Sequence, residues 1–258
     1  MNDDGTLTDR NDDKDFGLDW CRRMREWNEK GFFPADIATF ESETEYTSAG
    51  RLFSRYDRYM AGSEEKSNMA YGYKVCQIPT SDRVISRTSV QSTVSAISYN
   101  CKNPLRALKL VQLVHEDEYL LNLLCYGIEG RDFTKDPSDP KRMNRNADNY
   151  YISEYLVGSQ FLAYLAPEYS DDVWEKTKEE NDSAKVDPNI AFAFDRKPVE
   201  TEISNCSAVS EEYKGLDTGL YEDYESAYAE KQEKFKKAGS EIVKEEIERQ
   251  YKEWKDAQ

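Results

Sequence analysis

The sequence predicts a helix-rich α/β fold, and three observations support this class. Residues 88–132 carry, in order, the patterns of a strand, a sharp turn, two consecutive helices and a glycine-bounded loop. Apolar residues recur at helical spacing in several other segments, including two near the C-terminus. The chain has 18 Tyr, 10 Phe and 4 Trp, which supply large core side chains although 33% of the residues are charged. Its 258 residues suffice for one large domain or two small ones.

The N-terminal part predicts one firm helix followed by short elements. Residues 1–14 predict a flexible acidic arm. Asp15 can cap a helix over residues 16–30, which Gly31 ends. The further elements expected before residue 88 are an exposed segment at 39–49, a strand at 51–56, a polar loop at 64–68 and a strand at 71–78.

Residues 88–132 are the predicted core. The β-rich apolar run at 90–97 predicts a strand. Asn103 is a suitable N-cap and Pro104 a suitable first residue for the helix that follows, and Asp117 starts a second helix that Gly127 ends. Because so apolar a stretch is unusual in so polar a chain, we expect it to be buried, or else to leave an exposed patch where a partner lobe would cover it.

The remaining sequence predicts one long loop and then mainly helices. Residues 136–149 are rich in Pro, Asp, Asn and Lys and predict a loop, and residues 188–194 predict a short extended piece. The helices are expected at 150–164, 173–184, 198–213, 222–238 and 241–256, the last with Ser240 as its N-cap.

Charge and cysteine usage exclude several classes of partner and site. A net charge of −16 argues against nucleic acid or an anionic membrane surface as the main partner. No run has the length of a transmembrane helix, and the acidic N-terminus lacks the basic and apolar segments of a signal peptide. Five scattered cysteines without a CxxC pair indicate neither a disulfide framework nor a zinc site, and we expect Cys21 and Cys125 to pack in the core.

The sequence does not favour an enzyme. Its single histidine, His115, has no accompanying nucleophile motif, and GxSxG, P-loop, GxGxxG and HExxH patterns are all missing. With 51 acidic residues, paired carboxylates occur throughout and select no catalytic pair. We therefore expect no catalytic residue, no metal and no cofactor.

Aromatic residues beside polar ones are the best candidates for a binding site. Sugar rings stack on Tyr and Trp, and their hydroxyls bond to Arg, Asp, Asn and Gln. Alternatively, each of these tyrosines is an amphipathic residue at the edge of the core. The candidate clusters are Arg55, Tyr56 and Tyr59; Tyr126, Glu129, Arg131 and Asp132; and Asn149, Tyr150, Tyr151 and Gln160.

A series of segments resembles a known family in the order that the family has them. In chain order the segments are REWNEKGFF, AGRLFSRY, YGYKVCQIP, KNPLRALKLVQLVHEDEYLLNLLCYGIEG, SQFLAYL and FAFDRKPVETE. They resemble the C-terminal half of extracellular solute-binding proteins (family 1) of sugar-type ABC transporters, in the Firmicutes lipoprotein subgroup that ends in a domain of unknown function. The chain departs from the family after GIEG, where Asp132 and Phe133 replace a His-aromatic pair.

The resemblance implies part of a two-lobed fold of type II, like that of maltose-binding protein. By this analogy residues 15–74 and 133–258 belong to the C-terminal lobe, and residues 75–132 cross the hinge and pack in the other lobe. Arg55, Tyr56 and Tyr59 match the place where the family's lobe meets its ligand. The loop at 127–132 is a second candidate, either for the ligand or for the hinge.

The resemblance also implies a function in transport. Such a protein binds an extracellular solute, here most simply a carbohydrate or oligosaccharide, and delivers it to an ABC permease. The full-length parent would be extracellular and held at the cell surface by a lipid anchor that these residues do not include. The alternatives are a non-catalytic scaffold for protein interaction and, less favoured, an enzyme acting on glycans.

Overall fold

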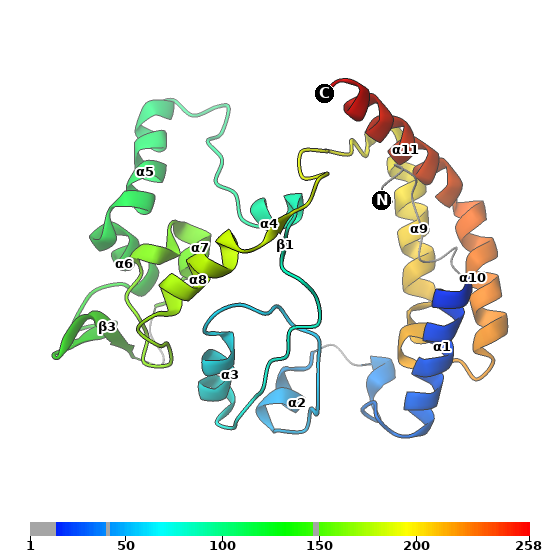
Figure 1. Cartoon of the computed structure of the whole chain (residues 1–258), viewed down its shortest axis with the longest axis horizontal. Coiled ribbons are helices and arrows are strands. Elements are labelled where there is room, and N and C mark those ends of the chain that lie inside the picture. Colours follow the sequence, from blue (N-terminus) through cyan, green and yellow to red (C-terminus); the bar gives the residue numbers. More distant parts are fainter. Residues whose placement is uncertain (1–13, 40–41, 147–149) are drawn as a thin grey trace. The chain divides into compact units, whose positions relative to one another are not determined.

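A computed structural model describes residues 14–39, 42–146 and 150–258 (Figure 1). The chain divides into two compact units. The terminal unit combines residues 1–43 with 192–258, and the central unit is formed by residues 44–191. The predicted acidic arm lies outside the described residues except for Lys14, which begins the first helix.

Helices are the secondary structure found in the described part of the terminal unit, and they are joined by turns and loops. Helix α1 packs on α10 and on the 3-10 helix η4, and α9 packs on α10 and α11 (Figure 1). Gly17 permits the close approach of α1 and α10, because a Cβ at this position would lie 2.3 Å from the Tyr228 hydroxyl. The elements are α1 (Lys14–Glu29), η1 (Ile37–Thr39), η3 (Lys197–Val199), α9 (Glu200–Glu212), η4 (Lys214–Thr218), α10 (Tyr224–Ala238) and α11 (Ser240–Asp256).

Two apolar clusters hold this unit together. The first joins α1 to α9, η4 and α10 through the buried residues Cys21, Tyr213, Leu216, Ala227 and Tyr228. The second lies on α11, where Phe192 packs edge-on against Tyr251, with 5.3 Å between ring centroids, and also contacts Trp254. The predicted apolar stripe of the last helix therefore packs against the segment that enters the unit at Phe192.

One carboxylate of α11 should make the stability of this unit depend on pH. Hydrogen bonds from Arg249 and Gln250 lower the pKa of Glu246 from 4.5 to about 2. A lowered folded-state pKa contributes stability above the unfolded-state value and loses it as pH falls through the folded-state value. As the pH falls from 4.5 to 2, the melting temperature of the wild type should therefore approach that of Glu246→Gln. If the two melting temperatures differ by the same amount at pH 7 and at pH 2, Glu246 does not make this contribution.

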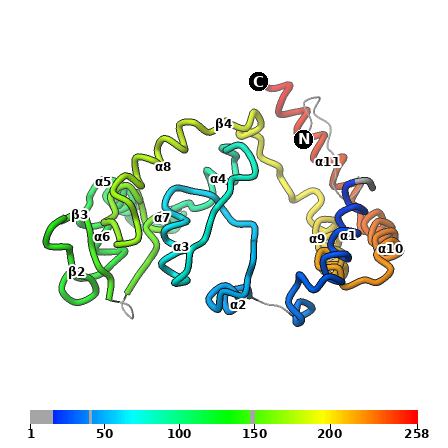
Figure 2. The backbone as a smooth tube through the Cα atoms, turned by 60° about the horizontal axis from the view of Figure 1, so that its bottom comes forward, coloured from blue at the N-terminus to red at the C-terminus, as the bar shows by residue number. Residues whose placement is uncertain are grey.

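The central unit contains short helices and two small sheets. Strands β1 and β4 pair in parallel, with Val84 opposite Lys185, and β2 and β3 pair antiparallel, with Phe133 opposite Arg145. Figure 2 shows that β4 follows directly from α8. The elements are α2 (Thr44–Ser48), α3 (Ser63–Tyr71), β1 (Val84–Ile85), α4 (Arg87–Val90), α5 (Pro104–Glu116), α6 (Glu118–Tyr126), β2 (Phe133–Asp136), β3 (Asp139–Arg145), α7 (Glu154–Val157), η2 (Gln160–Leu162), α8 (Val173–Asp182) and β4 (Lys185–Val186).

The core of the central unit forms where α6 meets the β2–β3 hairpin and residues 163–166. Asn122, a buried polar residue of α6, is satisfied there: its amide donates to the Leu162 carbonyl at 2.9 Å and accepts from the Tyr164 N–H at 2.8 Å. Backbone hydrogen bonds also join residues 163–166 to the hairpin: the Met143 N–H donates to the Leu165 carbonyl, and the Leu165 N–H donates to the Lys141 carbonyl. The buried residues of this core cluster are Leu121, Cys125, Tyr126, Phe133, Met143, Ala163, Tyr164 and Ala166.

Most predicted helices are confirmed, including their starts in the middle of the chain. Asn103 caps α5 by accepting from the Arg106 N–H, with Pro104 as first helical residue, and Asp117 caps α6 by accepting from the Leu120 N–H. Gly127 ends α6, as predicted. Cys21 and Cys125 are buried. Ser240, by contrast, is the first residue of α11, and Gly239 takes the N-cap position.

Several predicted elements are wrong. Residues 51–56 and 71–78 contain no strand, because no described segment pairs with them. Of the predicted strand at 90–97, Val90 ends α4 and residues 91–97 form neither helix nor strand. Residues 64–68 belong to α3, and residues 136–145 of the predicted loop belong to the β2–β3 hairpin, whereas residues 147–149 lie outside the described residues. The predicted helix at 150–164 contains only α7 and η2, separated by Gly158, whose Cβ position is filled by the Val114 carbonyl.

The predicted core at residues 88–132 is only half correct. Helix α6 is deeply buried, whereas α5 buries Val114 alone. Leu105 is 79% exposed and Leu108 54% exposed. The expected exposed patch is therefore present on α5. The assignment of residues 15–74, 75–132 and 133–258 to lobes concerns a whole two-lobed protein and remains a prediction.

Candidate functional site

The best-organised polar site near a predicted residue is built around Tyr59. We call Tyr59, Ala61, Arg83 and Glu180 the Tyr59 cluster. Its members come from the chain before α3, from the residue preceding β1 and from the last turn of α8. The side chains stand close together although they are far apart in sequence, so local folding alone does not explain their meeting.

Two backbone features bring these segments together. The β1–β4 pairing includes a bond from the Lys185 N–H to the Arg83 carbonyl, which holds Arg83 beside the end of α8. Gly62 has a φ of 76°, and a Cβ there would lie 2.7 Å from the ring of Tyr169 and 2.8 Å from Val173. Only glycine fits this turn without strain, so Gly62 lets the preceding residues lie against α8.

Arg83 and Glu180 form a bidentate ion pair. The guanidinium Nη1 and Nη2 lie 2.5 and 2.7 Å from Oε2 and Oε1 of Glu180. The Ala61 N–H donates to the same Oε2 at 3.0 Å. The Arg83 hydrogen bond lowers the pKa of Glu180, and the carboxylate in turn raises the pKa of Arg83, so both groups are charged at neutral pH.

Tyr59 adds an aromatic surface to this pair. The Arg83 guanidinium lies over its ring, 5.1 Å from the centroid, and 45% of Tyr59 is exposed. The Arg83 and Glu180 side chains keep 34% and 21% of their surface exposed. An exposed ring, N–H donors and carboxylate acceptors therefore lie within one small area, which is the combination that sugar hydroxyls and C–H faces require.

The other two residues of the first predicted cluster lie apart from this arrangement. Arg55 bonds to Asp57 at 2.5 Å and donates to the Tyr71 hydroxyl at 3.3 Å. Tyr56 is 91% exposed and lies outside any helix or strand. Of this predicted cluster, Tyr59 is the residue whose ring lies beside the Arg83–Glu180 pair.

The loop at 127–132 uses its predicted site residues to hold its own shape. Asp132 is buried and accepts from the Ile128 N–H at 2.8 Å and from Arg131 at 2.7 Å. Arg131 and this backbone bond lower the pKa of Asp132, and its carboxylate fills the space beside Gly127. Asp132 therefore stabilises the loop, and the exposed Arg131 side chain neutralises the charge of the Asp132 carboxylate.

The third predicted cluster is divided. Tyr151 stacks on Tyr126 with 6.0 Å between centroids, and Arg145 covers Tyr151 at 4.1 Å. Tyr150 is 47% exposed, and Gln160 begins η2 and is half-buried. Asn149 lies outside the described residues. The edge-of-core interpretation of these tyrosines therefore describes Tyr151 well, because one of its faces packs on the core residue Tyr126.

Sequence reasoning missed Arg83 and Glu180. Neither residue lies in a recognisable motif. Their contact depends on the two-residue parallel pairing of β1 and β4, which the sequence around them does not indicate. The clearest available signal was Gly62 after Tyr59, since a glycine there allows close approach to another element.

A separate hollow of about 570 Å³ lies within the terminal unit. It is formed by η1, the end of α9 and η4, and none of the predicted site residues lines it. Its wall residue Glu212 pairs with Lys234 at 2.6 Å, and Asp217 accepts from the Trp20 indole at 3.0 Å. Because these charges already have partners within the unit, we do not assign the hollow a ligand.

Two further observations concern His115 and the apolar character of the helices. His115 is exposed, and its Nδ1 lies 2.8 Å from the Val111 carbonyl of its own helix. In the described part of the chain, no helix combines the length and the apolar character needed to cross a membrane.

Comparison with known proteins identifies relatives over nearly the whole chain. Residues 188–256 match the family described as a domain of unknown function, DUF3502. A carbohydrate ABC transporter substrate-binding protein of Streptococcus pneumoniae serotype 4 (strain ATCC BAA-334 / TIGR4) is 27% identical over 248 residues. That match covers 90% of this chain and 48% of the relative, so the chain spans about half of the relative's length.

Solved structures show the same fold. The crystal structure of the N-glycan transport solute binding protein NgtS from Streptococcus pneumoniae matches with a TM-score of 0.82 and 23% identity, covering 98% of this chain and 57% of NgtS. The NgtS complex with Man5GlcNAc matches with a TM-score of 0.73 and covers 56% of that chain. The sequence-based resemblance is thus confirmed: this helix-rich α/β chain has the fold of part of a solute-binding protein and is similar to about half of a carbohydrate ABC transporter substrate-binding protein.

Proposed function

We propose that this chain is the solute-contacting part of an extracellular binding protein that delivers a carbohydrate to an ABC permease. The observation that carries the proposal is the Tyr59 cluster, where an exposed ring lies beside the Arg83–Glu180 pair. The named relatives support the choice of ligand, since one is a carbohydrate substrate-binding protein and NgtS has been solved with Man1GlcNAc and Man5GlcNAc. All of these relatives are named as transport proteins.

The chemistry of the cluster suits a neutral polyhydroxyl ligand. Glu180 has acceptor positions left after its bonds with Arg83 and Ala61, and Arg83 has N–H donors beyond the two that reach Glu180. A sugar hydroxyl can donate to the first and accept from the second, while a C–H face of the sugar ring packs on Tyr59. The paired charges cancel, so the site does not demand a charged solute.

The expected mode of action follows from a two-lobed fold. Such proteins bind their solute between lobes and close by hinge motion. We propose that the Tyr59 cluster contributes one side of that site. The parent protein would be extracellular and lipid-anchored, and its permease would recognise the closed form.

A ligand panel tests the function. We expect oligosaccharides of mannose and N-acetylglucosamine to raise the melting temperature of the 258-residue chain, because they bind its folded state. At ten times the dissociation constant the gain is about 1.4 kcal/mol, which corresponds to roughly 3–6 °C. Peptides of similar size should have no effect. No shift with any sugar, or new reducing ends after incubation with glycans, would contradict the proposal.

A further inference from the structure

The turn between Tyr59 and α3 packs against the ring of Tyr169. A Cβ built on Gly62 would lie 2.7 and 2.9 Å from two neighbouring carbons of that ring, Cδ1 and Cε1. Ala61, the residue just before Gly62, donates its N–H to Glu180 at 3.0 Å. Because Ala61 and Gly62 are adjacent in the chain, the position of the Tyr169 ring decides how closely the Ala61 N–H approaches the carboxylate.

The Tyr169 ring is held by packing rather than by its hydroxyl. It contacts the indole of Trp174, with 6.0 Å between ring centroids, and Trp174 packs edge-on against Phe161 at 6.1 Å. Among the described residues the Tyr169 hydroxyl has no hydrogen-bond partner. The place of the ring therefore depends on where the backbone of Tyr169 is held.

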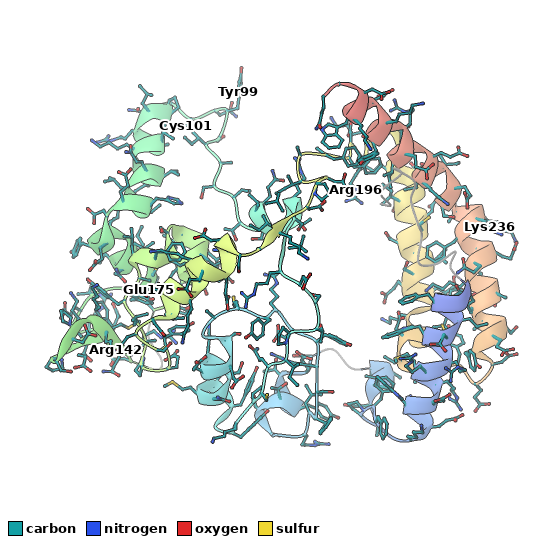
Figure 3. All side chains as sticks on the ribbon, viewed as in Figure 1. Tyr99, Cys101, Arg142, Glu175, Arg196 and Lys236 are labelled. Carbon is teal, nitrogen blue, oxygen red and sulfur yellow. The ribbon has the colours of Figure 1, made fainter. Side chains whose placement is uncertain are left out.

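Arg142 fixes that backbone. Figure 3 shows Arg142 on the β2–β3 hairpin. Its Nη2 donates to the Tyr169 carbonyl at 2.9 Å, and its Nε donates to Oδ1 of Asp171 at 2.9 Å. Nη2 also bonds to Asp171, and Oδ2 of Asp139 lies 3.8 Å from Nε. A planar guanidinium that reaches two residues of one turn fixes both the distance and the orientation of that turn.

The bond to the Tyr169 carbonyl is the more important of these contacts. The Asp171 side chain is 83% exposed, so water and salt weaken its ion pair with Arg142. The Arg142 side chain is only 22% exposed, and its bond to the carbonyl is partly buried, where a charge-assisted hydrogen bond is stronger. Arg142 also forms a β-bridge with Leu165, so it joins the hairpin to both ends of the segment that leads into α8.

We propose that Arg142 is a positioning residue for the Tyr59 cluster, although it lies on the hairpin and contacts no member of the cluster. By holding residues 169–171 it keeps the Tyr169 ring against Gly62, and Gly62 keeps the Ala61 N–H on Glu180. The Glu180 carboxylate is then oriented by two donors, Ala61 and Arg83. The effect of Arg142 on the cluster stands by itself, and its effect on a sugar rests on the proposed function.

The simpler alternative is that Arg142 only stabilises the fold. Arg142→Met keeps most of the aliphatic stem and removes the donors, whereas Arg142→Lys keeps the charge and can still donate to the Tyr169 carbonyl. The matched control is Lys141→Met, which removes the same charge from the neighbouring residue of β3, an exposed one. These variants separate the bonds of Arg142 from the loss of one positive charge.

Two NMR measurements on the 258-residue chain without sugar test the geometry. In Arg142→Met the Ala61 amide should exchange about fivefold faster than in the wild type, after division by the change at the core amide of Leu121. The pKa of Glu180 should rise, because the Ala61 N–H contributes to lowering it. Lys141→Met should leave both quantities unchanged, and Arg142→Lys should give intermediate values.

Sugar binding tests the consequence for function. The affinity for the oligosaccharide of mannose and N-acetylglucosamine that gives the largest thermal shift should fall about threefold in Arg142→Met and stay the same in Lys141→Met. Tyr169→Phe should bind like the wild type, because it keeps the ring that supports Gly62. If no sugar binds the wild type, the proposed function fails, whereas amide exchange and titration still decide the role of Arg142.

Three results would overturn the proposal. The first is unchanged Ala61 exchange together with an unchanged Glu180 pKa in Arg142→Met. The second is acceleration of the Ala61 and Leu121 amides by the same factor, which would mean that Arg142 only stabilises the fold. The third is an equal effect of Lys141→Met, which would assign the change to the lost charge.

Discussion

Leu121→Ala should lower the free energy of unfolding of the central unit by about 2–5 kcal/mol, the usual cost of a large cavity in a core. Leu121 has no exposed surface and belongs to the cluster that joins α6 to the β2–β3 hairpin. Its neighbour Asn122 is bonded to residues 162 and 164, which restricts the collapse of the surroundings into the cavity. Hydrogen exchange measured by peptide should show faster exchange in α6 and the hairpin.

The matched control is Leu108→Ala on α5. It removes the same atoms from a side chain that is 54% exposed, so we expect a change within about 0.5 kcal/mol. Equal losses at the two positions would show that α5 is buried in solution and would contradict the described division between α6 and α5. The pair therefore tests whether the leucine-rich stretch is core or surface.

Gly62→Ala should cost about 2–4 kcal/mol and should also weaken the Tyr59 cluster. The left-handed backbone conformation, with φ of 76°, contributes about 1–2 kcal/mol for an L-residue. The remainder comes from overpacking, because the new methyl would lie 2.7 Å from Tyr169 and 2.8 Å from Val173. Relief of this clash moves the chain away from α8 and lengthens the 3.0 Å bond from Ala61 to Glu180.

Gly72→Ala separates the two contributions. Gly72 has a φ of 71°, and apart from its chain neighbours no atom of the described residues lies within 4 Å of its Cβ position. It should lose only the backbone part, about 1–2 kcal/mol. Thermal or urea unfolding of both variants measures the difference, and equal losses would mean that residues 59–62 do not lie closely against α8.

The features that could be predicted from sequence are those fixed by nearby residues. Asn103 and Asp117 cap α5 and α6 because a short polar side chain reaches an N–H three residues ahead. The β2–β3 hairpin was missed because its turn, with Pro137, is as polar as a loop. Asp136 accepts from the Ser138 N–H at 2.8 Å in that turn, which is a local signal that could have been used.

The features that could not be predicted depend on distant partners. Residues 71–78 alternate like a strand, yet pairing requires a neighbour that their own sequence does not specify. Asp132 and Arg131 have residue types suited to a ligand, but the turn at Gly127 directs Asp132 into its own loop. Arg83 and Glu180 meet only through the β1–β4 pairing.

The most direct test of the central claim is the affinity for the oligosaccharide that gives the largest thermal shift, measured by saturation-transfer NMR or calorimetry. Tyr59→Ala and Arg83→Gln should each weaken binding at least tenfold, because they remove the ring and the donors of the Tyr59 cluster. Tyr119→Ala, which removes an aromatic residue 71% exposed on α6, should leave the affinity unchanged. Full affinity in both cluster variants would contradict the assignment of the sugar to this site.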